Sequence, residues 1–306
     1  MSPGSSASGA IVNAMTVDVE DYFQVSAFDA VVPRTDWDRL ESRVEANTDR
    51  LLQTFDDARV TATFFVLGWV AERFPALVKR IAAARHEVGS HGYAHRLIYD
   101  QTQDAFRDDV RRAKGTLEAL TGRLVEGYRA PSFSITSRSL WALDVLLGEG
   151  HRYDASIFPI RHDRYGIPGA PRHPHVLQRE RGSLIEAPGS TVRVGGMNLP
   201  VAGGGYFRIL PYAWTRWGIG RLNASEHRPA IFYLHPWEID PAQPRLSAGW
   251  LSRFRHYRNL DKTECRLRRL LRDFRFAPLR EMLLDVEGGP APTSHGWLAL
   301  SGSDGA

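Results

Sequence analysis

The stretch Val60-Thr61-Ala62-Thr63-Phe64-Phe65-Val66-Leu67 is rich in β-branched and aromatic residues, which predicts a buried β-strand. Apolar residues at helical spacing follow over residues 75–84, and residues 87–90 form the next short strand-like run. A strand, a helix and a second strand in this order are typical of a parallel βαβ unit. The stretch therefore places the chain in the α/β class.

The same alternation continues on both sides of this unit. Further predicted strands lie at 11–19, 184–187 and 231–234, with a short one leading to Tyr128-Arg129. Further predicted helices lie at 48–55, 103–120 and 137–147. We expect one parallel α/β barrel or sheet, in which functional residues gather at the carboxyl ends of the strands.

The length and composition fit one large domain. The chain has 306 residues, 43% hydrophobic and 24% charged, which is ordinary for a globular protein. We expect the domain to span 11–285, with a loop-rich insertion at 158–225 and a basic helical part at 245–285. Residues 1–10 and 286–306 have the loose composition of flexible ends.

The cysteine content and the lack of a visible membrane or secretory segment exclude several classes of protein. The single cysteine, Cys265, rules out an internal disulfide framework and a cysteine-rich zinc site. No apolar run approaches the roughly 20 residues that a transmembrane helix needs. Residues 1–10 lack the basic and apolar parts of a secretory signal, which favours a cytoplasmic location.

The net charge of +4 is unevenly distributed. Ten arginines and one lysine lie between Arg245 and Arg280, and Leu267, Leu270, Leu271 and Phe274 mark the apolar face of a helix there. The arginines are expected on its solvated face, from which they could also contact a membrane or an anionic polymer. No DNA-binding motif is present, so we expect no nucleic-acid partner.

Four polar clusters follow predicted strands. They are Asp18-Val19-Glu20-Asp21, His91-Gly92-Tyr93-Ala94-His95, Tyr128-Arg129-Ala130-Pro131 and Leu234-His235-Pro236-Trp237-Glu238. If the second cluster starts a helix or a tight helical loop, its two imidazoles share one face and can bind a divalent metal ion. The alternative is a pair of histidines in a turn, and for the acidic cluster a loop or a helix cap.

Together the clusters resemble the polysaccharide deacetylase family, carbohydrate esterase family 4, also called the NodB-homology domain. The resemblance runs from about Thr16 to about Trp237, with the His91/His95 pair similar to the family's metal-binding motif. Arg129-Ala130-Pro131 resembles its Arg-x-Pro motif, and Leu234-His235 its late Leu-His motif. The resemblance implies a deformed (β/α) barrel of the NodB type.

The acidic cluster departs from the family's common Thr-Phe-Asp-Asp-Gly form. Its order, Asp18-Val19-Glu20-Asp21-Tyr22-Phe23, resembles a branch that is associated with exopolysaccharide clusters of exosortase-containing bacteria. The resemblance implies that Asp18 is the base by position and that either Glu20 or Asp21 is the carboxylate ligand of the metal. Side-chain alternation along a strand favours Glu20, since it shares a face with Asp18.

The resemblance implies hydrolysis of N-acetyl groups on amino sugars of a polysaccharide, with metal-bound water as the nucleophile. One divalent ion is implied, zinc first, with cobalt, nickel or iron as alternatives. Asp18 would accept the proton of the water, Arg129 would hold Asp18, and His235 would protonate the leaving amine. Asp154 matches a family aspartate that supports this histidine, although a turn residue is the alternative.

Three other functions compete with this interpretation. The first is a metal-independent amidohydrolase of the same superfamily that acts on a cyclic imide or ureide. The second is a carbohydrate-binding protein without catalysis, although such a protein would not need Asp18, Arg129 and His235 together. The third is an interaction protein that uses the arginine-rich helix.

Overall fold

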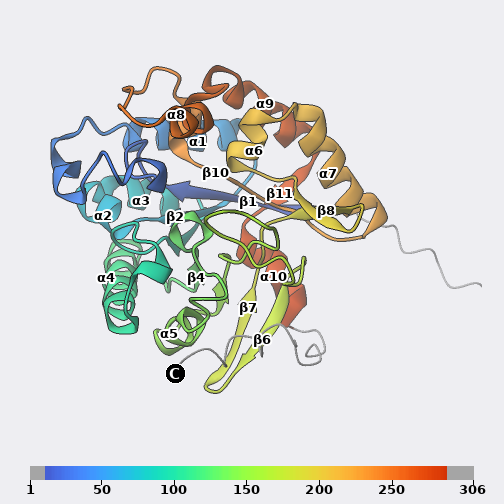
Figure 1. Ribbon diagram of the computed structural model, residues 1–306, viewed down its shortest axis with the longest axis horizontal. Helices are drawn as coiled ribbons and strands as arrows, with labels where there is room; N and C mark the ends of the chain where they lie inside the picture. The colour runs from blue at the N-terminus through green and yellow to red at the C-terminus, as the bar shows by residue number, and fades with distance from the viewer. Residues whose placement is uncertain (1–10, 288–306) are drawn as a thin grey trace, which may run out of the picture.

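A nine-stranded sheet forms the centre of the part of the chain that the computed structural model describes, residues 11–287 (Figure 1). Its strands are β1 (Val12–Val19), β2 (Thr63–Val66), β3 (Glu87–Ser90), β4 (Gly127–Tyr128), β5 (Tyr153–Asp154), β6 (His175–Arg179), β7 (Gly182–Glu186), β10 (Ile231–Leu234) and β11 (Arg275–Ala277). The order is β10-β1-β2-β3-β4-β5-β7-β6, and β11 also pairs with β1. Within this sheet only the β6–β7 pair is antiparallel.

The register brings the carboxyl ends of the parallel strands to one edge. Val19 of β1 lies opposite Val66 of β2, and Val66 lies opposite Ser90 of β3. Ser90 in turn lies opposite Tyr128 of β4. The residues that follow these strands therefore leave the sheet side by side, which is where α/β proteins place their sites.

Helices cover the sheet within residues 11–287. The α-helices are α1 (Val44–Ala58), α2 (Gly68–Arg73), α3 (Pro75–Ala83), α4 (Gln103–Thr121), α5 (Ala142–Gly148), α6 (Gly204–Ile209), α7 (Tyr212–Ser225), α8 (Trp250–Tyr257), α9 (Leu260–Asp273) and α10 (Leu279–Glu287). Short 3-10 helices are η1 (Ser26–Phe28), η2 (Arg34–Arg39), η3 (Ile98–Asp100), η4 (Pro131–Phe133) and η5 (Pro236–Ile239). A two-stranded hairpin, β8 (Thr191–Val194) and β9 (Met197–Pro200), stands apart from the main sheet.

Helix α4 shows how the sequence sets such an element. The Thr102 side chain accepts a hydrogen bond from the Ala105 N–H at the start, and Gly122 ends the helix in the left-handed conformation. Its buried residues recur at helical spacing and are Phe106, Val110, Ala113 and Leu117. One apolar stripe thus packs the helix against the core.

The structure confirms the predicted α/β class and its parallel sheet. In the described residues the pairing runs from β10 to β6 without joining these two strands, so the barrel is deformed and open there. Strands β3 and β10 have the predicted bounds, whereas α5 begins at Ala142, five residues later than predicted. No helix in the described part is long and apolar enough to cross a membrane.

Residues 158–225 contain more regular structure than the predicted loop layer. Strands β6 and β7 extend the main sheet, and the β8–β9 hairpin, α6 and α7 follow. The prediction of a loop layer was wrong here, because Gly195 and Gly196 form the turn of the β8–β9 hairpin and the glycines from Gly203 begin α6. The predicted flexible ends, 1–10 and 288–306, lie outside the described residues, while 286 and 287 belong to α10.

Candidate metal and catalytic site

Glu20, His91 and His95 meet at the carboxyl edge of the sheet. Glu20 directly follows β1, His91 directly follows β3, and the loop after β3 carries His95. The Glu20 Oε2 atom lies 2.7 Å from Nε2 of His95 and 3.8 Å from Nε2 of His91. One donor atom from each residue falls within 4.8 Å of the others, and all three side chains are buried. The group has the make-up of a two-histidine, one-carboxylate metal site.

A loop, not a helix, brings the two histidines together. Gly92 and His95 adopt positive φ angles of 73° and 49°, so the segment is a turn, the alternative that the spacing left open, and not the start of a helix. The Asp109 carboxylate accepts hydrogen bonds from the Tyr93 and Ala94 N–H groups, at 2.6 and 3.2 Å. Arg34 donates to the carbonyl oxygens of Ala94 and His95 from the other side. These contacts fix a turn that sequence spacing alone does not reveal.

The orientation and charge of the Glu20 and His91 side chains suit the binding of a cation. The Nδ1–H of His91 donates to the Arg129 carbonyl oxygen at 2.8 Å, which leaves the lone pair of Nε2 directed at Glu20. Burial lowers the pKa of His91 to about 4, so its imidazole is neutral near pH 7. Burial alone would raise the pKa of Glu20, but the three nearby imidazoles lower it to about 2. Glu20 Oε2 is buried, and its one close polar neighbour among the described residues is His95 Nε2 at 2.7 Å, so the two potential ligand atoms face each other.

The structure does not bring Asp21 to the histidines. Its carboxylate accepts hydrogen bonds from the Ser42 hydroxyl at 2.6 Å and from the Arg43 and Val44 N–H groups at the start of α1. Burial raises the pKa of Asp21 to about 6, although these hydrogen bonds lower it. Asp21 therefore occupies the position of a helix cap, the alternative that the acidic cluster left open.

Asp18 and Arg129 form a buried ion pair beside the cluster. Nη1 of Arg129 lies 2.8 Å from Asp18 Oδ1 and donates to the Thr16 hydroxyl at 2.7 Å. The guanidinium also donates to the Ala155 carbonyl oxygen and stacks over the Phe65 ring. Because Arg129 is held on all sides, it orients Asp18 and compensates its charge.

His235 follows β10 and faces both carboxylates. Its Nε2 lies 3.8 Å from Asp18 Oδ2 and 3.7 Å from Glu20 Oε1. Burial lowers the pKa of His235, but a hydrogen bond to Glu238 and the carboxylates of Glu20, Glu238 and Asp18 raise it to about 9. The imidazole is therefore protonated at neutral pH and can donate a proton.

Glu238, not Asp154, is the acidic partner of His235. The Nδ1–H of His235 donates to Glu238 Oε1 at 3.2 Å, and Arg208 Nε lies 3.3 Å from the same oxygen. Asp154 instead accepts a hydrogen bond from the Ser156 hydroxyl and lies beside the buried Glu186, whose pKa burial raises. Sequence reasoning missed Glu238, and its place three residues after His235 was the available signal.

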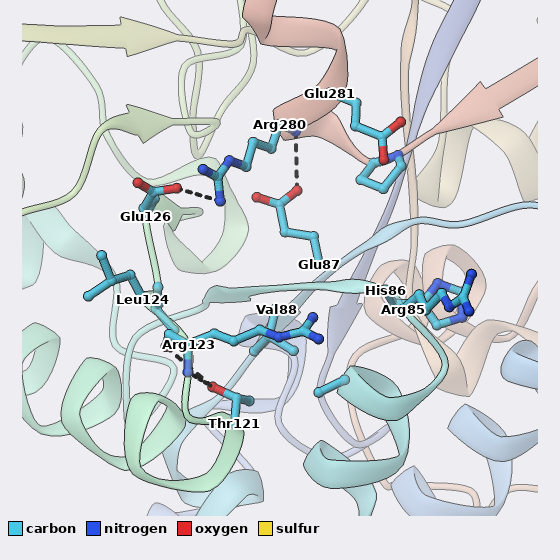
Figure 2. Close-up of a pocket in the computed structure, with 13 residues that line it drawn as sticks. Arg85, His86, Glu87, Val88, Thr121, Arg123, Leu124, Glu126, Arg280 and Glu281 are labelled. Carbon is cyan, nitrogen blue, oxygen red and sulfur yellow. Dashed lines mark hydrogen bonds and ion pairs between the residues drawn. The ribbon is translucent and has the colours of Figure 1, made fainter.

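A pocket of about 450 Å3 lies away from these groups, at the amino-terminal ends of the strands. Figure 2 shows Glu87, at the start of β3, and Glu126, just before β4, facing Arg280 of α10. The Arg280 guanidinium pairs with the Glu126 carboxylate at 2.8 Å, and the backbone N–H of Arg280 donates to the Glu87 carboxylate at 3.1 Å. None of the predicted site residues lines this pocket, whose charges join α10 to the sheet.

The carboxyl edge of the sheet thus combines an arginine-held aspartate, a protonated histidine and a potential metal site. Groups of this kind at the carboxyl edge of a parallel sheet can bind a cation and accept or donate protons. Residues 27–146 match the family model for polysaccharide deacetylase, so this part of the chain is similar to that family. Residues 155–284 match a second model, described as a domain of unknown function (DUF3473).

Named relatives are similar to part of the chain. A peptidoglycan-N-acetylglucosamine deacetylase of Bacillus cereus is 35% identical over 98 residues, 32% of this chain and 36% of that protein. A peptidoglycan deacetylase of Helicobacter pylori is 33% identical over 113 residues, 37% and 38% of the two chains. The peptidoglycan-N-acetylmuramic acid deacetylase PdaA of Bacillus subtilis is 29% identical over 159 residues. The chain spans 36%, 38% and 58% of the lengths of these relatives.

Solved structures share the fold over most of the chain. A candidate polysaccharide deacetylase from Mycobacterium smegmatis is 21% identical, with a TM-score of 0.65 over 96% of this chain and 98% of that one. Puue allantoinase is 14% identical, with a TM-score of 0.60 over 92% and 91%. At these identities the similarity concerns the fold alone.

Proposed function

We propose that the protein is a metal-dependent deacetylase that hydrolyses N-acetyl groups on amino-sugar residues of a polysaccharide. One observation carries the proposal: the ends of β1, β3, β4 and β10 bring the potential metal ligands, a paired aspartate and a protonated histidine to one buried edge. The names of the relatives, which are deacetylases of N-acetylated glycans, support the same reaction.

The donor set fits a divalent ion, with zinc first and cobalt, nickel or iron as alternatives. Such an ion would polarise the acetamido carbonyl and lower the pKa of a water molecule to about 7. Glu20, His91 and His95 would hold it, with His91 oriented by the Arg129 carbonyl oxygen.

The other residues would move the protons. Asp18 accepts the proton of the attacking water, and Arg129 keeps the Asp18 carboxylate directed at that position. His235 gives its proton to the nitrogen of the leaving amine, so that the C–N bond breaks to acetate and a free amino sugar. Glu238 positions the His235 ring through Nδ1.

An exopolysaccharide is the substrate that we propose within this class. The motif from Asp18 to Phe23 supports it through its resemblance to the exopolysaccharide-associated branch. The relatives are named for peptidoglycan, which also carries N-acetylated amino sugars.

Acetate release from N-acetylglucosamine oligomers tests the reaction. We expect turnover that is lost on complete removal of metal by a chelator, returns with added zinc or cobalt, and falls more than about 100-fold in His91→Ala. Metal analysis of the purified protein is expected to give one ion per chain. Turnover that survives both metal removal and His91→Ala would overturn the mechanism.

A further inference from the structure

A pocket of about 420 Å3 opens beside the catalytic groups, and the active-site chemistry does not use it. Its volume lies in the range of small-molecule sites, about 300–1,000 Å3. Apart from Val25 and Ala27, its lining residues all come from the segment 155–284, whose family model has no assigned function. The pocket is thus built almost entirely by this segment.

Aromatic rings form the walls of the pocket. Tyr165 stacks on Phe158 with ring centroids 5.9 Å apart, and the His162 ring stacks on Tyr165 at 3.8 Å. The Tyr165 and Tyr206 hydroxyls lie 3.2 Å apart. Flat rings with hydroxyl groups at their edges can contact the apolar face of a sugar ring and its hydroxyl groups together.

The pocket shares a wall with the catalytic site. The Trp237 ring, which lines the pocket, stacks on His235 with centroids 5.1 Å apart, and its indole N–H donates to Glu20 Oε1 at 3.2 Å. Tyr233, also in the lining, directly precedes Leu234 and His235 on β10. A glycan bound at the catalytic groups would therefore extend its neighbouring residue into this pocket.

An arginine gives the rim of the pocket a positive charge. Arg255 of α8 lines the pocket, is exposed, and approaches Asp163 only to 3.9 Å. That distance is too long for a hydrogen bond, so its donors can take an anionic ligand. The rim therefore favours a carboxylate over a neutral group.

We propose that this pocket is a specificity site that binds a carboxylate-bearing sugar next to the N-acetylated sugar that is hydrolysed. The proposal rests on the proposed deacetylase function. The aromatic walls take the sugar ring, and Arg255 pairs with its carboxylate. Two sources share this chemistry: a uronic acid in an exopolysaccharide, and the lactyl carboxylate of N-acetylmuramic acid in peptidoglycan.

The test compares oligosaccharides that differ in the neighbouring sugar. Acetate release is measured for neutral N-acetylglucosamine oligomers, for oligomers that alternate N-acetylglucosamine with glucuronic acid, and for peptidoglycan strands without peptides. Binding of the same ligands is measured by tryptophan fluorescence, which does not require turnover. The variants are Arg255→Ala, Arg255→Lys and, as a matched control on the same helix, the exposed Arg253→Ala, which lies outside the pocket.

We expect wild type to favour a carboxylated ligand, and Arg255→Ala to raise its Kd about tenfold with little effect on the neutral oligomer. Arg255→Lys should keep part of the preference, Arg253→Ala should keep all of it, and high salt should weaken it. The carboxylated ligand whose Kd rises in Arg255→Ala shows whether the carboxylate belongs to a uronic acid or to N-acetylmuramic acid. An equal effect of Arg255→Ala on neutral and carboxylated ligands, or no effect on binding, overturns the inference.

The binding measurement and the acetate-release measurement test the pocket and the deacetylase function separately. Arg255-dependent binding without acetate release under any metal would contradict the deacetylase function but would still support the pocket as a site for a carboxylate-bearing sugar. Acetate release without any dependence on Arg255 would contradict the pocket alone.

Discussion

Glu20 and Asp21 are neighbours in the sequence, yet their carboxylates serve different parts of the molecule. Glu20 faces the two histidines, whereas Asp21 caps α1 through Ser42, Arg43 and Val44. Alternation along β1 predicted which one points to the site, because Asp18 and Glu20 leave the strand on the same side. The capping role of Asp21 depends on a helix that begins 23 residues later, which no local pattern reveals.

This division of roles predicts opposite effects of two conservative changes. Glu20→Gln is expected to weaken metal binding more than about 100-fold with little loss of stability, because a charged ligand is removed. Asp21→Asn is expected to keep the metal but to lower the free energy of unfolding by about 1–2 kcal/mol, because the cap is weakened. Metal titration and urea unfolding measure the two effects, and loss of metal in Asp21→Asn alone would reverse the assignment.

Glu238 makes the activity depend on pH through His235. A proton donor must be protonated, so the rate is expected to fall as the pH rises through the His235 pKa of about 9. Glu238→Gln removes a hydrogen-bonded carboxylate, which lowers this pKa and moves the fall to lower pH. We also expect kcat to fall about tenfold to 100-fold, since the ring loses its orientation.

The pH profile of kcat checks this prediction. His235→Asn serves as the control, because a variant without the titrating ring should lose the alkaline limb that His235 causes. An unchanged alkaline limb in Glu238→Gln would show that the Glu238 carboxylate does not act through His235.

Helix α9 shows what amphipathic spacing does and does not predict. The predicted apolar face is confirmed, with Leu267, Leu270 and Leu271 buried. The arginines on its other side are used in part within the molecule: Arg266 donates to three carbonyl oxygens around α6, and Arg268 pairs with Asp57 and Glu264. Composition revealed the charge of the helix but not these internal partners, which apart from Glu264 of the same helix come from distant segments.

Helix α6 begins at glycines that no other residue can replace without strain. Gly203 has a φ angle of 112°, and a Cβ there would lie 2.2 Å from the Tyr233 carbonyl oxygen of β10. We expect Gly203→Ala to lower the free energy of unfolding by more than about 2 kcal/mol. Gly205→Ala is the matched control, because its Cβ would meet nothing nearer than 3.9 Å. Thermal unfolding compares the two, and equal melting temperatures would refute the close approach.

His86 links the strands β2 and β3 and makes the fold sensitive to acid. The ring lies in the pocket of Figure 2, and its Nδ1 accepts a hydrogen bond from the Ala62 N–H at 3.0 Å. Burial lowers the pKa of His86 from 6.5 to about 4. Between these pH values the unfolded chain binds a proton that the folded protein excludes, so stability falls on acidification by up to about 3 kcal/mol.

His86→Asn keeps an acceptor for the Ala62 N–H but does not titrate in this range. The variant is therefore expected to lose less stability than wild type between pH 6.5 and pH 4. Urea unfolding at both pH values measures the difference between the two proteins. Equal losses would show that His86 is not the group responsible.

The main sheet contains strands from both the N-terminal and the C-terminal part of the chain, and the sequence pattern presents these strands only one after another. The alternation of strands and helices predicted the parallel class, but not that β10 and β11 would both pair with β1. These pairings join residues more than 200 positions apart, and the information for them lies in packing across the core. The same pairings bring His235 to Asp18, so the complete site also depends on them.

This arrangement predicts that the chain does not divide into two independent domains. A fragment of residues 11–150 contains Asp18, Glu20, His91, His95 and Arg129, but it lacks β10 and β11 and leaves an edge of β1 unpaired. We expect the fragment to be unfolded and unable to bind metal, whereas residues 11–287 unfold in one cooperative transition. Circular dichroism, amide NMR dispersion and metal titration compare the two chains. Because the fragment holds every proposed metal ligand, tight metal binding by a folded fragment would show that the segment 155–284 is separable, and the shared-sheet account of the site would fail.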